Sequence, residues 1–549
     1  MNDVPAGLSQ DRDGAPGAER GIGAGLYAWF KQSADRDPGQ DALVISGQSY
    51  SYRQLDEAAT NLAVVLHRTT RPGPIGVIAS RTIEAFVGYL AASRLNRAVV
   101  PLAVDSPVQR NRRVCQAAGV VALVADRSLG AEPHFDQTWR TLAPVIFPED
   151  TPRLLCTDVW EEPNAEHVAY ILFTSGTTGA PKGVPIRNKQ LSEYIPFAAA
   201  MFQVDHRSRL SQTFDLTFDP SVFDMAVTWY AGGTLVVPTA EELLAPASFV
   251  ASQRISHWFS VPALISIASR MHNLQAQSMP SLQFSAFAGE PLTVSDAQKW
   301  QKAAPNSRIA NLYGPTELTV TSTGFMLPLL LGNWPTTDNG TVPIGAPNDH
   351  LEAALRTASG FEVLNLSAAA QIGLEGELCI RGSQRFDGYL DPRDNEGVFV
   401  RDDGSPISVV AFAAASLFER RQLWYRTGDL VSVTPAGLVH RGRLDSQVKI
   451  AGKRIEIGEI ESSLRAFAGV QEVAVVVAGT GRVKLHAFVV GDRVTPEAVR
   501  RFAKALLPAH GVPHVITVLE ALPLSRSGKI DRKALGAIAA SGSAQPPPP

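Results

Sequence analysis

The stretch YILFTSGTTGAPKGV (170–184) carries the most informative group of polar residues in the sequence. An apolar run leads into a loop that holds Thr174, further hydroxyl side chains, three glycines and Lys182. Glycines let main-chain N–H groups turn toward an anion, hydroxyls donate further hydrogen bonds, and the lysine adds positive charge. The loop differs from a P-loop because Lys182 follows a proline and precedes a glycine. The pattern favours a polyphosphate ligand, although a flexible Gly/Ser/Thr surface loop can share this composition.

Five further motifs follow this loop in order along the chain. They are NLYGPTE (311–317), GELCIRG (376–382), YRTGD (425–429), GRLDSQVKI (442–450) and PLSRSGKID (523–531). With the loop, they resemble the motifs of the adenylate-forming (ANL) superfamily, which includes acyl- and aryl-CoA ligases, luciferases and the adenylation domains of nonribosomal peptide synthetases. The resemblance extends from about Leu26 to Leu535, nearly the whole chain.

The resemblance implies ATP and Mg²⁺ as cofactors, together with residues that hold them. Thr174 and Thr316 are expected to hydrogen-bond the α-phosphate, and Lys182 supplies positive charge. Lys529 is expected to reach the substrate carboxylate and the α-phosphate, where a positioned cation stabilises the charge that concentrates in the transition state. Glu317 resembles the family's Mg²⁺ ligand, and one carboxylate suffices because Mg²⁺ keeps waters and phosphate oxygens as its other ligands.

Recognition of the nucleoside is expected from the later motifs. Asp429 follows Gly428 in a turn, where its carboxylate suits both ribose hydroxyls, although an Asp can also satisfy its own turn. Tyr313 can stack on adenine and Asn311 can read its edge, or either can belong to the core. The remaining residues that the resemblance implies for nucleotide binding are Ser175, Gly176, Thr177, Thr178, Gly179, Gly289 and Arg443.

The motif at 442–450 lies where the sequence pattern changes from a large to a small domain. In the superfamily, an Asp at this place is the hinge about which the small domain turns between adenylation and thioester formation, and Asp445 matches it. Hinges are a few residues that absorb a change in φ and ψ away from the reacting atoms. The resemblance therefore implies a two-state cycle about Asp445.

The segment FDPSVFD (218–224) bears on the class of substrate. In amino-acid-activating relatives, an Asp at the position of Asp219 pairs with the substrate's α-ammonium group, and aryl- and fatty-acid activators lack it. The physical argument agrees, since a carboxylate in an apolar pocket is costly unless a cation meets it. Asp219 can instead cap the following helix, a role for which Asp215 and Asp224 also compete.

The other substrate-pocket positions carried over from the resemblance are Pro220, Phe223, Phe259, Ala286, Ala288, Leu312, Val320 and Thr321. Apart from Asp219 and Lys529, this predicted wall has no formal charge, which favours a neutral amino acid. Two phenylalanines narrow the pocket and favour a compact aliphatic substrate such as alanine, valine or proline. The match at Phe259 is the least anchored of these positions.

These residues predict an AMP-forming ligase that activates an amino acid as aminoacyl-AMP and then loads the phosphopantetheine thiol of a carrier protein. No carrier segment with a modifiable serine is recognisable after Lys533, so the expected enzyme is freestanding and its carrier is a separate polypeptide. Two alternatives stay open. One is an acyl- or aryl-CoA ligase that uses free coenzyme A, against which Asp219 argues. The other is a non-catalytic nucleotide-binding regulatory protein.

The elements that must position these residues follow from length and patterning. A chain of 549 residues exceeds one compact core, so two or more domains are expected. Short Val/Ile-rich runs alternate with helical stretches from 75 to 124 and recur to 289, which indicates buried parallel strands. An amphipathic helix from Leu26, a hairpin turning at Gly47 and a helix capped by Ser51 open the ordered chain.

The predicted fold is α/β. A large N-terminal domain of β-sheets flanked by helices plus a distorted β-barrel precedes a small, mobile α+β domain. The predicted boundaries are a disordered tail at 1–24, the adenylation core at 25–444, the C-terminal lid at 445–537 and a disordered Pro-rich tail at 538–549.

Composition excludes several other classes. With 45% apolar residues, 19% charged residues and a net charge of −3, the chain has no basic field for nucleic acid or an acidic membrane. Three scattered cysteines indicate neither a disulfide framework nor a zinc cluster, and they fit a reducing compartment. No apolar run approaches the ~18 residues of a membrane span, and the polar N-terminus lacks a signal core. We therefore expect a cytoplasmic protein without nucleic-acid or membrane partners.

Overall fold

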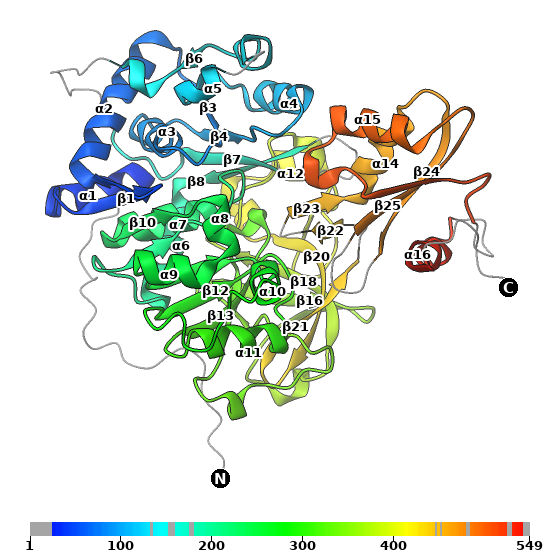
Figure 1. Cartoon of the computed structure of the whole chain (residues 1–549). Helices are drawn as coiled ribbons and strands as arrows, with labels where there is room; N and C mark the ends of the chain where they lie inside the picture. The colour runs from blue at the N-terminus through cyan, green and yellow to red at the C-terminus, as the bar shows by residue number, and fades with distance from the viewer. Residues whose placement is uncertain are drawn as a thin grey trace.

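The computed structural model of the chain describes residues 25–131, 135–151, 160–174, 181–444, 447–450, 453–478, 484–523 and 530–541. The predicted N-terminal tail, most of the predicted phosphate loop (175–180), Asp445, Lys529 and residues 542–549 lie outside the described residues. Figure 1 shows a large part, coloured blue to yellow, with the orange and red C-terminal part on its right-hand side.

The described chain opens with the helix and hairpin that the sequence predicts. These elements are α1 (Leu26–Arg36), β1 (Asp41–Ile45), β2 (Gln48–Ser51) and α2 (Tyr52–Thr69). The Ser51 side chain accepts a hydrogen bond from the Gln54 N–H, and the Gln54 side chain accepts one from the Ser51 N–H. This reciprocal pair is a capping box, so the predicted N-cap is confirmed.

A six-stranded sheet with the order β6-β5-β3-β4-β7-β8 follows. Its strands are β3 (Ile75–Ile78), β4 (Val99–Leu102), β5 (Ala122–Val124), β6 (Val145–Ile146), β7 (Val168–Thr174) and β8 (Lys182–Arg187), interleaved with α3 (Ile83–Arg94), α4 (Val108–Ala118) and α5 (Arg127–Gly130). β3 pairs in parallel with β4 and β5, as predicted, whereas β7 and β8 are antiparallel. Because β7 ends at Thr174 and β8 begins at Lys182, this sheet fixes both ends of the predicted phosphate loop.

A nine-stranded sheet has the order β15-β14-β13-β12-β11-β9-β10-β1-β2. Its further strands are β9 (Arg209–Ser211), β10 (Thr234–Val237), β11 (His257–Ser260), β12 (Phe284–Phe287), β13 (Arg308–Tyr313), β14 (Thr323–Met326) and β15 (Ala346–Pro347). The accompanying helices are α6 (Asn188–Met201), α7 (Pro220–Ala231), α8 (Ala240–Leu244), α9 (Pro246–Gln253), α10 (Ala263–Arg270) and α11 (Val294–Ala303). β9 to β13 run parallel to one another. Residues that follow their carboxyl ends, such as Ala288 and Gly289, therefore gather at one edge, where ligands bind in α/β sheets.

A third, antiparallel sheet forms the half-barrel that stands where the sequence predicts a distorted barrel. It consists of β16 (Leu351–Arg356), β17 (Phe361–Val363), β18 (Glu375–Gly382), β19 (Phe399–Val400), β20 (Trp424–Thr434) and β21 (Gly437–Arg443), with α12 (Val409–Ala414) and α13 (Leu417–Arg421). In the β20–β21 pair, Asp429 stands opposite Arg443. One hairpin thus brings together two residues of the predicted nucleotide site.

The C-terminal part is a small α+β unit. It contains β22 (Gln447–Ile450), β23 (Lys453–Glu456), α14 (Ile457–Arg465), β24 (Val470–Ala478), β25 (Lys484–Gly491), α15 (Pro496–Leu506), β26 (Val515–Val518) and α16 (Arg532–Ser541). The predicted boundary at residue 537 is too early, because α16 continues to Ser541. Ile538, only 2% exposed, packs in one apolar cluster with Val476 and Phe488. The sequence around Ile538 consists of small residues, which favoured a disordered tail. The contact of Ile538 with this apolar cluster instead buries one face of the helix.

The large and small parts touch through a partly buried ion pair. Arg110 on α4 pairs with Glu459 on α14, and their side chains are 15% and 9% exposed. Within the described residues, no helix combines the length and the apolarity needed to cross a bilayer.

Candidate active site

A cleft of about 410 Å³ opens at the edge of the large domain and is also lined by Pro508 and His510 of the small domain. Its lining brings together residues that are far apart in the sequence. The predicted site residues among them are Thr174, Asp219, Pro220, Ala288, Gly289, Thr316, Val320, Asp429 and Arg443. The concave shape, the largely apolar lining and the few convergent polar groups are typical of a small-molecule site.

The carboxylate of Asp429 is the centre of a polar cluster on one side of the cleft. Tyr313 donates its hydroxyl to Oδ2 at 2.6 Å, His440 Nε2 lies 3.0 Å from Oδ1, and Arg443 Nη1 lies 2.9 Å from Oδ1. Burial, followed by the charge of Asp429, raises the pKa of Tyr313 well above its ordinary value, so the phenol stays protonated and donates. The sequence motifs contain Asp429, Tyr313 and Arg443, but they gave no reason to select His440.

Asn311 and Tyr313 lie on β13, at the predicted adenine site. Asn311 is 2% exposed, and its side-chain nitrogen donates to the carbonyls of Val342 and Pro343 at 2.9 and 3.0 Å. Tyr313 is 6% exposed and directs its hydroxyl to Asp429. Both side chains are therefore held by neighbouring protein groups, and their contacts with adenine stay a prediction.

Glu317 is the carboxylate predicted to hold Mg²⁺. It is completely buried, and its Oε1 accepts a hydrogen bond of 2.6 Å from the Tyr389 hydroxyl. No cluster of three His, Cys, Asp or Glu side chains suited to a metal occurs in the part of the chain that the structure describes. A single ordered carboxylate fits Mg²⁺ when phosphate oxygens and waters complete the shell. The adjacent Thr316 lines the cleft, so the Glu317 carboxylate belongs to a residue next to the cleft wall.

Lys182 begins β8, directly after the predicted phosphate loop. Its side chain is 16% exposed, its Nζ lies 3.8 Å from Asp394 Oδ1, and it stands 5.2 Å from the centre of the Tyr389 ring. Ser175, Gly176, Thr177, Thr178, Gly179, Lys529 and Asp445 lie outside the described residues, so their predicted roles stay predictions. The sequence did not indicate the contacts with Tyr389 and Asp394.

Asp219 occupies the position before α7, yet its side chain makes no capping hydrogen bond. Its Oδ2 instead accepts from the N–H of Val320 at 3.1 Å, and the residue is 7% exposed at the wall of the cleft. Val320 has a φ of +70°, a conformation that costs free energy for a β-branched residue. Asp219 thus stabilises a strained turn across the cleft and places a negative charge at its wall.

Aromatic rings pack against one another beside the cleft. Phe214 lines the cleft and lies 4.8 Å from Phe259 between ring centres, and Phe259 lies 4.9 Å from Phe223. Phe223, Phe259 and Ala286 line a separate cavity of about 20 Å³, room for about one water molecule. Phe214, which the sequence did not select, therefore stands between the cleft and two predicted pocket residues.

The last two predicted pocket residues face other neighbours. Leu312 is 4% exposed within the main apolar cluster. The Thr321 hydroxyl forms a hydrogen bond of 2.7 Å with the hydroxyl of Tyr194. Neither residue lines the cleft or the small cavity.

The expectation that Asp219 and Lys529 are the charged groups of the wall is wrong, because Arg81, Asp105, Arg110 and Asp215 also line the cleft. Arg81 is held in place by main-chain carbonyls. It lines the cleft and donates to the carbonyls of Thr213 at 2.6 Å and Pro238 at 3.1 Å. Burial lowers the pKa of Arg81, and the negative charges of Asp215 and Asp224 act in the opposite direction. The guanidinium is therefore held by hydrogen bonds to two main-chain carbonyl oxygens.

Comparison with known proteins agrees with this geometry. The family model described as "AMP-binding enzyme" matches residues 30–390, and the model of its C-terminal domain matches residues 459–529. The chain therefore belongs to the AMP-binding enzyme family. Its solved relatives include an adenylation domain.

Similar proteins include much longer synthetases. The chain is 31% identical over 527 residues to phosphinothricin tripeptide synthetase PhsC of Streptomyces viridochromogenes, with 93% of this chain and 45% of that protein covered. It is 30% identical over 522 residues to bacitracin synthase 3 of Bacillus licheniformis, with 93% of this chain and 8% of that protein covered. The chain thus spans less than half of the length of these relatives.

Solved structures match over nearly the whole chain. IdnL7 is 33% identical with a TM-score of 0.67, and 95% of this chain and 100% of that chain are covered. The Vibrio cholerae adenylation domain AlmE, in complex with glycyl-adenosine-5'-phosphate, is 26% identical with a TM-score of 0.80. That comparison covers 96% of this chain and 100% of AlmE.

Proposed function

We propose that this chain activates a neutral, compact amino acid with ATP, releases pyrophosphate and transfers the aminoacyl group to the phosphopantetheine thiol of a separate carrier protein. The observation that carries the proposal is Asp219, a carboxylate that stands at the wall of an apolar cleft without capping its helix. A cation stabilises a buried carboxylate of this kind, and the α-ammonium group of an amino acid supplies one. The AlmE complex with a glycyl adenylate supports the same class of substrate.

In the first half-reaction, an oxygen of the substrate carboxylate bonds to the α-phosphorus, and the bond from that phosphorus to the bridging oxygen breaks to release pyrophosphate. Thr174 and Thr316 line the cleft, where their hydroxyls can donate to the α-phosphate. Lys182 and Lys529 supply positive charge to the phosphates and the substrate carboxylate. Such preorganised donors favour the transition state without a side-chain nucleophile. Mg²⁺, held by Glu317, would neutralise phosphate charge.

Asp429 is assigned to the ribose. Its carboxylate offers about four acceptor sites, and Tyr313, His440 and Arg443 are among the groups that contact it. His440, with a side chain 25% exposed, is the most accessible of these donors. We expect the ribose hydroxyls to replace the hydrogen bond from His440 to Asp429 when the nucleotide binds.

The expected substrate side chain is small and uncharged. Phe214 and, behind it, Phe223 and Phe259 limit the depth of the cleft. Arg81 is committed to two carbonyl oxygens, so an acidic side chain gains little from it. Alanine, valine and proline fit this description.

In the second half-reaction, the carrier thiolate attacks the acyl carbon and AMP leaves with the oxygen that bridged the two groups. The relatives are peptide synthetases much longer than this chain, which supports a carrier as acceptor. The small domain is proposed to turn about Asp445 between the two half-reactions.

The test is amino-acid-dependent ATP–pyrophosphate exchange across the proteinogenic amino acids, several β-amino acids and aryl acids. Compact neutral amino acids should give the fastest exchange. Asp219→Ala should reduce it about 100-fold or more, because losing one partner of a buried charge pair costs about 3 kcal/mol. Asp205→Ala is a matched control, since the hydrogen bonds that the Asp205 carboxylate accepts come from Arg207 and Ser208 in its own turn. Preferential activation of aryl acids, or full activity of Asp219→Ala, would contradict the proposal.

A further inference from the structure

A segment of residues 385–395, here called the bracing segment, connects β18 to β19 and packs against the start of β8. The Leu390 N–H donates to the carbonyl of Gly183 at 3.0 Å. Asp394 Oδ1 lies 3.8 Å from the Lys182 ammonium, and the Tyr389 ring lies 5.2 Å from the same ammonium. The segment therefore surrounds the lysine that follows the phosphate loop.

The same segment also holds Glu317. The Phe386 N–H donates to the Glu317 carbonyl at 2.9 Å, and the Tyr389 hydroxyl donates to Glu317 Oε1 at 2.6 Å. Glu317 and Phe386 are completely buried, and Tyr389 is 9% exposed. A hydrogen bond to a charged acceptor in such surroundings is short and strong, so it fixes the orientation of the carboxylate.

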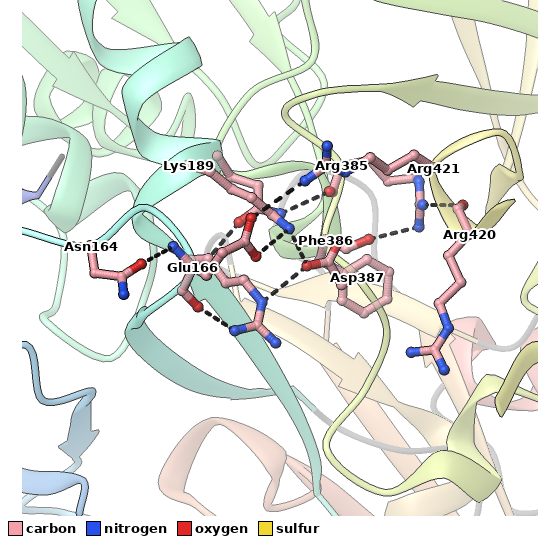
Figure 2. A network of polar contacts seen from close by, with 10 residues as sticks. Asn164, Glu166, Lys189, Arg385, Phe386, Asp387, Arg420 and Arg421 are labelled. Carbon is pink, nitrogen blue, oxygen red and sulfur yellow. Dashed lines mark hydrogen bonds and ion pairs between the residues drawn. The ribbon is translucent and has the colours of Figure 1, made fainter. Parts of the chain in front are cut away.

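Ion pairs anchor the bracing segment to the end of β8 and the start of α6. Figure 2 shows Asp387 facing Lys189, and Asp387 Oδ2 lies 2.7 Å from Lys189 Nζ and 3.0 Å from Arg187 Nε. Burial favours the protonated form of Asp387, but the hydrogen bond and charge of Lys189, with the charge of Arg187, outweigh it and hold the pKa of Asp387 below its ordinary value. The carboxylate therefore stays ionised and the anchor persists at neutral pH.

A local hydrogen bond fixes Tyr389 itself. The Tyr389 N–H donates to Asn395 Oδ1 at 3.0 Å, and Asn395 is 2% exposed. The preceding Gly388 has a φ of +123°, where a side chain would be strained and would also approach Asn395 Oδ1 to 3.0 Å. These contacts hold the main chain at Tyr389, and its side chain extends to Glu317 and Lys182.

We propose that Tyr389 is a positioning residue for the phosphate end of the nucleotide site. Its hydroxyl orients the Glu317 carboxylate, and its ring orients the Lys182 ammonium. One side chain thereby sets the relative positions of the group assigned to Mg²⁺ and a group assigned to the phosphates. This inference rests on the proposed function, from which both assignments come.

The test is Tyr389→Phe, which keeps the ring and removes only the hydroxyl. Calorimetric titration with ATP is carried out on the full chain in excess Mg²⁺ and again in EDTA, and the ratio of the two affinities gives the gain due to Mg²⁺. We expect this gain to fall about tenfold or more in the variant, the size of a lost hydrogen bond to a charged group. In pyrophosphate exchange, the KM for Mg·ATP should rise, while the KM for the amino acid stays unchanged.

Tyr52→Phe is the matched control. Tyr52 is 1% exposed and donates its hydroxyl to the Gly233 carbonyl at 2.8 Å, outside the cleft. It should lose a comparable buried hydrogen bond and keep the full gain from Mg²⁺. An unchanged gain in Tyr389→Phe, or an equal loss in both variants, would overturn the inference.

A double variant shows whether Tyr389 acts through Glu317. In a Glu317→Gln background, Tyr389→Phe should cause no further loss of the gain from Mg²⁺, whereas independent effects would multiply and overturn the inference. Failure of the proposed function is distinguishable, because the unmodified protein would then show no amino-acid-dependent exchange at all.

Discussion

On the nucleotide side of the cleft, polar side chains are fixed by direct hydrogen bonds and ion pairs, whereas on the substrate side aromatic rings pack against one another. Tyr313, His440 and Arg443 contact the Asp429 carboxylate, and Arg443 stands opposite it on the neighbouring strand. Phe223 lies on α7, Phe259 lies on β11 and Phe214 lies in the loop after β9, and the Phe259 ring packs against both other rings. The polar side is therefore set by short-range geometry within a few motifs. The apolar side depends on how distant elements are stacked.

This difference predicts two kinds of response to substitution. A change on the polar side should reduce nucleotide affinity and leave the choice of amino acid unchanged. A change on the aromatic side should reduce stability and alter the choice of amino acid, because rings fill volume and do not direct charge.

The largest effect is expected for Asp429→Asn. The amide keeps the shape of the carboxylate but removes its charge, so the Arg443 guanidinium loses its buried counter-charge and the ribose loses an acceptor. The KM for ATP should rise about 100-fold, a cost of about 3 kcal/mol, with the order of preference among amino acids retained. Exchange measured at varied ATP and at varied amino acid separates these two quantities.

Asp338→Asn is the control for that substitution. Asp338 pairs with Arg441, also on β21, but its side chain is 72% exposed. A surface pair of this kind contributes about 0–1 kcal/mol, so kinetics should be unchanged. If Asp429→Asn altered the preferred amino acid instead of the KM for ATP, the two sides of the cleft would not be separable.

Phe259→Ala is expected to change the rate of exchange less than Asp429→Asn does, and to act mainly on stability and on the choice of amino acid. Phe259 packs against Phe214 and lines the cavity of about 20 Å³, so removing its ring should enlarge this cavity on the side of Phe214. The free energy of unfolding should fall by about 3–5 kcal/mol, the usual cost of a buried Phe→Ala change. Exchange with leucine or phenylalanine should rise relative to exchange with alanine, while the KM for ATP stays within about twofold.

Phe412→Ala separates lost packing from altered selectivity. Phe412 is 3% exposed and stacks on Phe399 with ring centres 4.6 Å apart, and it lines neither cavity. It should cost similar stability and keep the original preference. Equal changes of preference in both variants would assign the effect to general loosening of the protein.

Residues that lie within short motifs could be predicted from the sequence. Asp429, Tyr313 and Arg443 belong to motifs, and the hairpin register brings two of them together. The capping box at Ser51 and the parallel β3–β4–β5 strands are local patterns that the structure confirms. In these cases, neighbouring residues in the sequence carry the information.

Other residues gave no such signal. Arg81 and Phe214 belong to no motif, and their place at the cleft depends on the packing of β3 and β9 against distant strands. Tyr389 lies in a stretch whose Gly and Asp residues indicate only a turn, and its partners Glu317 and Lys182 are 72 and 207 positions away. The end of the small domain was missed for the same reason, because Ile538 acquires a buried face only through β24 and β25.

In the proposed reaction, the carboxylate of an amino acid attacks the α-phosphate of ATP. This step can be tested most directly with alanine labelled with oxygen-18 in its carboxylate, incubated with Mg·ATP and an amine or thiol acceptor, with the AMP product analysed by mass spectrometry. Each AMP should carry one oxygen-18, because the oxygen that bonded to the α-phosphorus leaves with AMP. Unlabelled AMP, or ADP as the nucleotide product, would contradict it.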